Sequence, residues 1–232
     1  MPLDFNKVLS EWRASLCAQI ELAALISRNR IAHKWKVTYR SIVLRELVSW
    51  RVVDLLEQSV ALMNQRHFLG AVILLRSAFE TLGILIFLNH KTDAVVKGNE
   101  SFFDLCDTTS RLMLGSKNQS TRLAAVNILT VLEKCEKIYP GILELYAHLS
   151  ESAHPNYDGV CSGYSQIDEN KYTTAFANRW AEKYENRLPD GLELCMSMFD
   201  NEYNNVWPET YGRLETWLVN KDEWLEENKP GI

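Results

Sequence analysis

The stretch from His67 to His90 constrains the fold most, because it is apolar on nearly every side of an α-helix. Neighbouring helices must cover such a segment, so we expect a central core helix. Its length also approaches the roughly 20 residues that cross a bilayer. Arg76 and Glu80 lie near its midpoint, where each charge would be costly in lipid. We therefore predict no membrane segment.

Composition is typical of a globular chain with one well-buried core. The 232 residues are 47% hydrophobic and 24% charged, and we expect a single all-α domain over residues 1–232. The formal net charge of −5 gives no overall basic field that would attract nucleic acid. Any contact with RNA must therefore be local.

Cysteine usage points to a reducing compartment. The five cysteines are widely spaced, odd in number and never arranged as CxxC, which argues against a disulfide framework and against a zinc site. Charged residues interrupt the N-terminal stretch where a signal peptide would be apolar. We expect a cytoplasmic protein.

Apolar periodicity predicts six to eight α-helices and no extended sheet. Thr38 and Thr92 are the expected N-caps of two of these helices, and Pro140 is expected in the first turn of another. The segments on either side of residue 67 should form an antiparallel hairpin around the core helix. The expected helices are 5–27, 38–66, 67–90, 92–113, 121–138, 140–154 and C-terminal packing helices within about 168–226.

The least regular stretch follows Pro155, which should stop the preceding helix. Gly159 and Gly163 stand there among short β-favouring pieces. This pattern indicates a structured loop or a small hairpin over the helical core.

Motifs for cofactor or metal chemistry are missing from the sequence. It has no glycine-rich phosphate loop, no HExxH and no Glu-x-x-His of a di-iron site. We therefore predict no cofactor and no metal.

Two histidine sites remain as candidates for catalysis. The first pairs Arg28 with His33, since a histidine that exchanges protons near neutral pH beside a phosphate-holding arginine suits metal-free RNA cleavage. The second is His154, at an expected helix end and before a polar turn that contains Asn156 and Tyr157. Each site also has a plain alternative: a basic solvated helix end for the first, and a helix stop for the second.

Arg76 and Glu80 stand four residues apart on one face of the core helix. A buried ion pair rarely exceeds a hydrophobic replacement in stability, so something should use these charges. In a structural account, Arg76 bonds loop carbonyls near His154 and Pro155 while Glu80 holds the arginine. In a functional account, the pair faces a cleft with His154 and binds an anion, and Asn156 and Tyr157 are further candidate ligand-binding residues.

A family resemblance rests on the run GAVILLRSAFETLGILIFL and the later LYAHLSESAHPNYDG. Over roughly residues 37–159 the chain resembles the helical bundle of the HEPN superfamily, and more closely bacterial HEPN-like helical proteins. The resemblance implies a homodimer in which an Arg-x4–6-His motif from each subunit forms a shared ribonuclease site. Many members are toxins or antiviral defence ribonucleases, whereas others have lost the motif and only bind.

The chain departs from the family pattern at this motif. Where the motif is expected, the chain offers His154 with His148 before it and no arginine four to six residues earlier. The well-formed Arg28–His33 motif precedes the central hairpin instead of following it.

Three functions follow from this reading: a metal-independent endoribonuclease acting on RNA, a non-catalytic protein that binds or assembles with a neighbouring gene product, or a module that senses a nucleotide or another small ligand.

Overall fold

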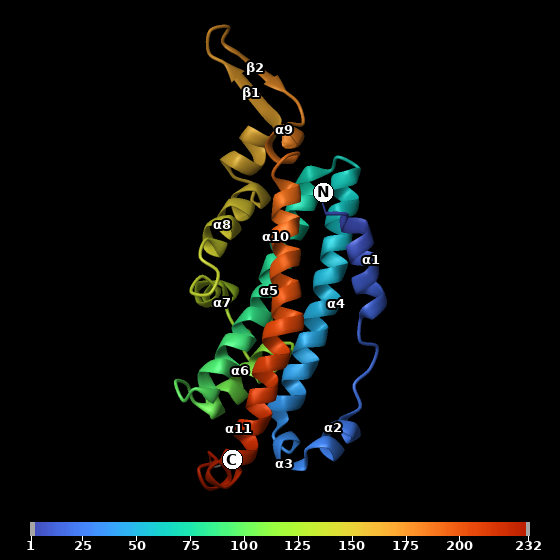
Figure 1. The fold of residues 1–232 in the computed structure, drawn as a ribbon. Helices are drawn as coiled ribbons and strands as arrows, with labels where there is room; N and C mark the ends of the chain where they lie inside the picture. Colours follow the sequence, from blue (N-terminus) through green and yellow to red (C-terminus); the bar gives the residue numbers. More distant parts are fainter. Residues whose placement is uncertain (1–2, 231–232) are drawn as a thin grey trace. The chain divides into compact units, whose positions relative to one another are not determined.

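The computed structural model describes residues 3–230 and confirms the predicted all-α fold (Figure 1). In these residues a single two-stranded sheet accompanies eleven α-helices and two π-helices, so the expected count of six to eight helices was too low. The helices are α1 (Phe5–Ser15), α2 (Leu22–Arg28), α3 (Arg30–His33), α4 (Lys36–Asn64), α5 (Phe68–Val96), α6 (Phe102–Leu114), α7 (Ile128–Cys135), α8 (Ile142–Ala153), α9 (Trp180–Tyr184), α10 (Leu188–Asn201), α11 (Trp207–Glu227) and the π-helices η1 (Tyr157–Ser162) and η2 (Glu202–Val206).

The chain divides into two compact units, each assembled from three segments. Unit 1 comprises Met1–Ser15, Trp50–Leu82 and Cys135–Met198, and unit 2 comprises Leu16–Ser49, Gly83–Lys134 and Phe199–Ile232. Each of the long helices α4 and α5 therefore contributes one part to each unit.

Within unit 1 the second part of α4 and the first part of α5 form the expected hairpin. The connection is short, and the Ser59 hydroxyl donates a hydrogen bond of 2.8 Å to the Ala71 carbonyl. Gly70 makes the close approach possible, because a Cβ atom there would lie 2.9 Å from Leu62 Cδ1. Leu75 and Phe79 of α5 are buried in this unit.

The predicted small hairpin of unit 1 is present after residue 155. Strands β1 (Ser165–Asp168) and β2 (Thr173–Phe176) pair antiparallel, with Ser165 opposite Phe176, and extend away from α9 (Figure 1). The π-helix η1, which precedes them, was not predicted. Gly159 allows it to turn back on the end of α8, because a Cβ there would collide with the His154 carbonyl oxygen at 1.9 Å.

Unit 2 has an apolar core of its own. Trp35, Val95 and Phe102 are buried there with residues of α11, and the Trp35 and Phe102 rings meet edge to face at 5.3 Å. Trp207 is buried and Trp217 packs against this core, whereas Trp224 near the end of α11 is exposed. The full cluster is Ala32, Trp35, Val37, Val95, Phe102, Leu105, Leu214, Leu218 and Leu225.

Two expected N-caps were wrong. Thr38 and Thr92 lie inside α4 and α5, where their hydroxyls donate to the carbonyls of Trp35 at 2.9 Å and Leu88 at 2.7 Å. A threonine in a helix can satisfy its hydroxyl on the preceding turn, so it need not mark a boundary. Helix α5 continues to Val96, and Ser101 caps α6 instead.

Several helix boundaries also differ from the prediction. The segment 5–27 is two helices separated by residues 16–21, and 121–138 is helical only over α7. Apolar spacing alone misled here, since Leu22 and Ile26 are exposed. Helix α8 starts after Pro140, where the Glu136 carboxylate accepts from the backbone N–H groups of Gly141 and Leu143 at 2.9 and 3.0 Å.

Among the described residues, α5 is the one helix whose length and composition would allow it to cross a membrane. Inside the protein, 67% of its most apolar window is buried. A core helix passes the same test, so the observation favours the predicted core role of this helix.

The core of unit 2 gives a first prediction. Leu105 of α6 is fully buried, so Leu105→Ala should lower the free energy of unfolding by about 2–5 kcal/mol through lost burial and a new cavity. Leu114 ends the same helix and is 45% exposed, so Leu114→Ala should change it by less than about 0.5 kcal/mol. Urea unfolding of both variants measures the difference, and equal losses would contradict this assignment of the core.

Candidate functional site

Arg28 and His33 lie together in unit 2, at the ends of two short helices. Arg28 is the last residue of α2 and His33 the last residue of α3, and the Asn29 side chain between them accepts from the Ala32 N–H at 3.0 Å. Asn29 thereby caps α3 and turns the chain. The turn leaves Arg28 Nη2 3.3 Å from His33 Nε2, as the sequence motif predicted.

The imidazole of His33 is closed off from solvent, with its side chain 1% exposed. Nε2 lies 2.9 Å from Glu215 Oε1, and Nδ1 lies 3.1 Å from the Thr38 hydroxyl. Because that hydroxyl donates to the Trp35 carbonyl, it accepts from His33, so Nδ1 carries a proton. Arginine can only donate, so Nε2 accepts from Arg28 Nη2, and the same guanidinium nitrogen also contacts Glu215.

Charge in this cluster is balanced among three side chains. Burial, together with the Arg28 charge, lowers the pKa of His33. Burial raises the pKa of Glu215, against the opposing effect of the nearby Arg28 guanidinium, which forms an ion pair with it. The sequence did not reveal Glu215, because it stands on α11, far along the chain from the motif that it completes.

His154 belongs to unit 1 and is exposed at the C-cap of α8, one residue beyond the helix end. The Asn156 side chain accepts from the Gly159 N–H at 3.0 Å, which caps η1, and donates to Glu151. Tyr157 is 78% exposed. These contacts give Asn156 a structural role as the cap of η1.

Arg76 and Glu80 form the expected ion pair, with Arg76 Nη2 3.0 Å from Glu80 Oε1 and about a quarter of each side chain exposed. The expected bonds to loop carbonyls near His154 and Pro155 are wrong. Arg76 instead donates to the hydroxyls of Ser150 at 2.8 Å and Tyr146 at 2.7 Å, and Tyr146 donates to Glu80 at 2.7 Å. The pair therefore joins α5 to α8.

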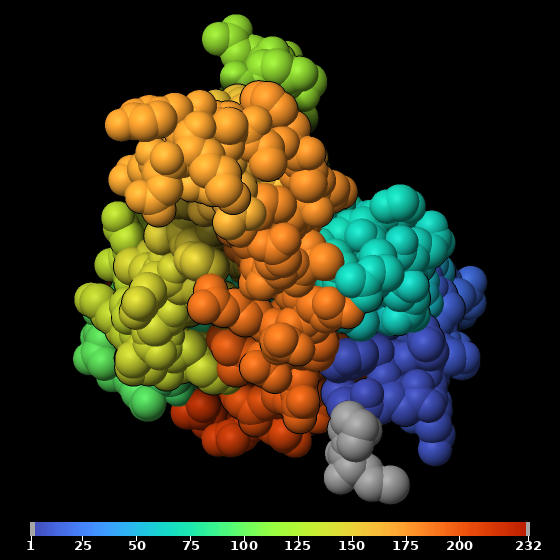
Figure 2. Space-filling view, turned by 90° about the horizontal axis from the view of Figure 1, so that it is seen from above, coloured from blue at the N-terminus to red at the C-terminus, as the bar shows by residue number. Residues whose placement is uncertain are grey.

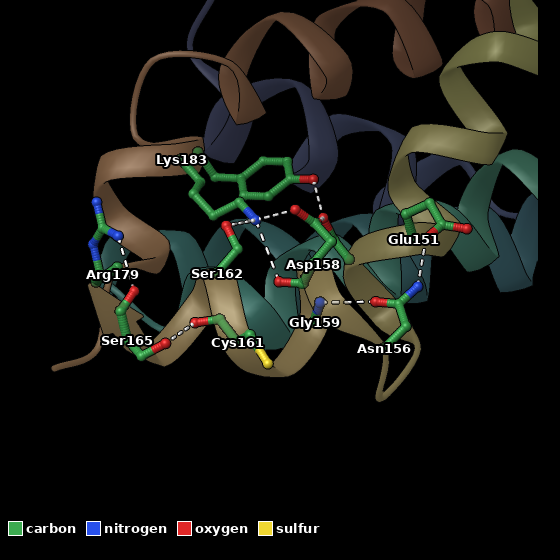
Figure 3. Close-up of polar contacts among 11 residues, drawn as sticks. Glu151, Asn156, Asp158, Gly159, Cys161, Ser162, Ser165, Arg179 and Lys183 are labelled. Atoms are coloured by element: carbon green, nitrogen blue, oxygen red, sulfur yellow. Dashed lines mark hydrogen bonds and ion pairs between the residues drawn. The ribbon is translucent and has the colours of Figure 1, made fainter. Parts of the chain in front are cut away.

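A second polar network ties η1 and α9 to the end of α8. Figure 3 shows Lys183 reaching the Asp158 carboxylate, with which it forms an ion pair, and the Ser162 hydroxyl at 3.2 Å. The Ser152 hydroxyl donates to Asp158 at 2.7 Å and lies 2.6 Å from the Tyr184 hydroxyl. Burial raises the pKa of Tyr184 and so favours its neutral form.

Lys183 and Ser162 resemble a serine–lysine pair, but the electrostatics argue against catalysis by them. Burial opposes ionisation of Asp158, yet the bonds from Lys183 and Ser152 outweigh it and lower the pKa of that carboxyl. Lys183 is engaged by the Asp158 carboxylate in an ion pair and donates to Ser162, so it is not placed as a base for the serine hydroxyl. The network is structural.

A cavity of about 450 Å³ opens beside this network in unit 1. Figure 2 views the face on which the olive α8 and the orange start of α10 border a hollow. Its volume falls in the range of small-molecule sites. The walls come from α5, α8, α9 and α10: Leu75, Gly141, Glu144, Leu145, His148, Leu149, Tyr184, Arg187, Leu188 and Gly191.

The cavity combines an apolar wall with a charged rim. Leu149 and Leu188 are buried in the wall, whereas Glu144, His148 and Arg187 are exposed at the rim. The His148 ring lies 6.2 Å from the Tyr184 ring. None of the sequence-predicted site residues lines this cavity, and no sequence motif includes its lining residues as a set.

A third polar cluster surrounds η2 in unit 2. The Arg45 guanidinium lies over the Tyr203 and Trp207 rings at 3.6 and 4.5 Å from their centroids. Buried Glu202 accepts from Asn89 Nδ2 at 2.7 Å. These contacts hold η2 against α4 and α5.

Across residues 3–230, no group of three or more His, Cys, Asp or Glu side chains is placed to hold a metal ion. The chain matches no protein-family model, no curated protein and no solved structure. The candidate sites in the two units therefore rest on their geometry alone.

The Arg76 network gives a second prediction. Arg76→Ala should lower the free energy of unfolding by about 2–3 kcal/mol, because it leaves a half-buried Glu80 without its cation. The double variant Arg76→Met with Glu80→Leu should recover most of that loss.

Arg66→Ala is the matched control, because it breaks an ion pair with Glu185 whose side chains are 61% and 50% exposed. Its cost should be clearly smaller than that of Arg76→Ala, because water screens an exposed ion pair. Chemical unfolding measures the free energy of unfolding of the four proteins. If Arg76→Ala lowers it no more than the control does, the Arg76 network does not stabilise the α5–α8 contact.

Asp158 gives a prediction about pH. Its folded pKa lies below its ordinary value of 3.8, so its stabilising effect is complete above that value and is lost as pH falls through the folded pKa. Asp158→Asn should therefore flatten the rise of unfolding free energy with pH in this acid range. Chemical unfolding of the wild-type protein and this variant across the acid range measures the slope, and an equal slope in both would contradict the role of Asp158.

Proposed function

We propose that this chain is a HEPN-like helical protein that acts by binding rather than by cleaving RNA, with the cavity between α8 and α10 as its binding site. The all-α fold around α5 is compatible with that class. The single observation that carries the proposal is the enclosure of His33, whose imidazole is 1% exposed and partnered at both nitrogens.

Enclosure matters because a general acid or base must come within hydrogen-bond reach of the proton that it transfers. In His33 the outward nitrogen already faces Glu215 and Arg28. A phosphodiester could approach it only after Glu215 had moved away. The exposed His154 has the opposite deficiency, since the sequence places no arginine four to six residues before it.

A metal-independent ribonuclease of a toxin or antiviral system is the second candidate. It is favoured by the 3.3 Å approach of Arg28 to His33 and by the 2.9 Å approach of Glu215 to the same imidazole. A homodimer, RNA or a neighbouring gene product are the partners that the HEPN resemblance suggests for either candidate. Cytoplasmic residence belongs to the same proposal.

An RNA-cleavage assay in EDTA separates the two candidates. We expect no cleavage of single-stranded RNA above buffer, and no toxicity on overexpression. His33→Ala should lower the melting temperature because it empties a buried position and removes one of the two partners of the partly buried Glu215. His154→Ala, at an exposed position, is the control and should leave that temperature unchanged.

Cleavage by the wild-type protein that persists in EDTA would overturn the binding proposal. If Glu215→Gln abolished that cleavage while the protein stayed folded, the Arg28–His33–Glu215 cluster would be the active site.

A further inference from the structure

We infer that the α8–α10 cavity binds a carboxylate with a long unbranched apolar chain, which names the ligand class of the proposed binding site and therefore rests on the proposed function. Two features of unit 1 support this class. One end of the site offers an unpaired cation, and the other end continues into a second, mainly apolar cavity.

Arg187 supplies the polar end. Its side chain is exposed at the rim and forms no ion pair or hydrogen bond with any residue of the described chain 3–230. Most other arginines near it are committed, such as Arg66 to Glu185 and Arg179 to Glu182. A guanidinium donates two parallel hydrogen bonds to a carboxylate, and His148 on the same rim can add a third donor.

A second cavity of about 370 Å³ supplies the apolar end. It shares Gly141 and Leu145 with the first cavity, so the two adjoin along α8. Its remaining walls carry no ionisable side chain apart from the phenol of Tyr139. They are Phe79, Ile138, Tyr139, Pro140, Ile142, Leu194 and Met198.

Exposed apolar side chains in the second cavity indicate a missing cover. Leu194 is 47% exposed and Ile138 39% exposed, although both line the cavity wall. An apolar chain lying there would remove their surface from water, at about 25 cal/mol for each Å² buried. The binding free energy would then come mainly from the chain and the orientation from the carboxylate.

The two ends are far enough apart for a long ligand. Arg187 immediately precedes α10, and Met198 lies eleven residues further on, which the helical rise converts to about 16 Å. Gly191 lets the Leu75 side chain lie close against α10, since a Cβ there would be 2.9 Å from Leu75 Cδ2.

Glu144 provides a test of the charge assignment. It is exposed on the same rim and, like Arg187, is without an ion-pair partner among the described residues. A carboxylate ligand would be repelled by Glu144 and attracted by Arg187. An amine ligand would show the reverse.

Titration calorimetry of the full chain with dodecanoate, below its micelle concentration, tests the inference. Dodecanol and dodecylamine are matched probes with the same chain. We expect dodecanoate to bind at least tenfold more tightly than either, because a charge-assisted hydrogen bond contributes that much.

Variants locate the site. Arg187→Gln should weaken dodecanoate binding about tenfold, and Glu144→Gln should strengthen it. Leu145→Trp should abolish binding, because residue 145 lies where the two cavities adjoin. Arg122→Gln is the matched control, since Arg122 is exposed and lines neither cavity. Circular dichroism and the melting temperature show that each variant is folded.

The outcomes separate this inference from the proposed function. Equal binding of dodecanol and dodecanoate, blocked by Leu145→Trp, would leave a binding protein and overturn the carboxylate class. Tighter binding of dodecylamine, weakened by Glu144→Gln, would also overturn it. Binding that no variant changes would be surface adsorption and would overturn the site itself, whereas RNA cleavage in EDTA tests the proposed function independently.

Discussion

The structure depends on covering α5, a long apolar helix most of whose apolar surface is buried. Its first part is buried in unit 1 against α4, and its second part contributes Val95 to the core of unit 2. Because both units cover one helix, the hydrophobic effect that buries it stabilises both of them. Polar contacts add specificity to this burial, since the hydrogen bond of Arg76 with Tyr146 pairs one face of α5 with α8.

Features that depend on neighbours in sequence could be predicted. The apolar run around Phe79, the α4–α5 hairpin and the irregular segment after Pro155 follow from local pattern and chain-stiffness rules. The ion pair of Arg76 with Glu80 also follows, because residues four apart share a helical face. Helix ends were less accessible, since Thr38 satisfies its hydroxyl within a helix as readily as at a cap.

The candidate sites could be predicted only in part, because their decisive partners are distant in sequence. The Arg28–His33 approach was visible from the motif, but Glu215, which closes it, comes from the last helix. The α8–α10 cavity gave no sequence signal. Its wall residues Leu145 and Leu188 look like ordinary core positions, and only the packing leaves space between their helices.

The β1–β2 hairpin has a consequence for handling the protein in solution. All four residues of β2 are exposed, and the strand has neither the charges nor the proline that usually protect a sheet edge. Its outer backbone groups can pair with any extended chain, including the same strand of another molecule. Self-association through this edge should therefore grow with protein concentration. A stable dimer, by contrast, would persist when the protein is diluted.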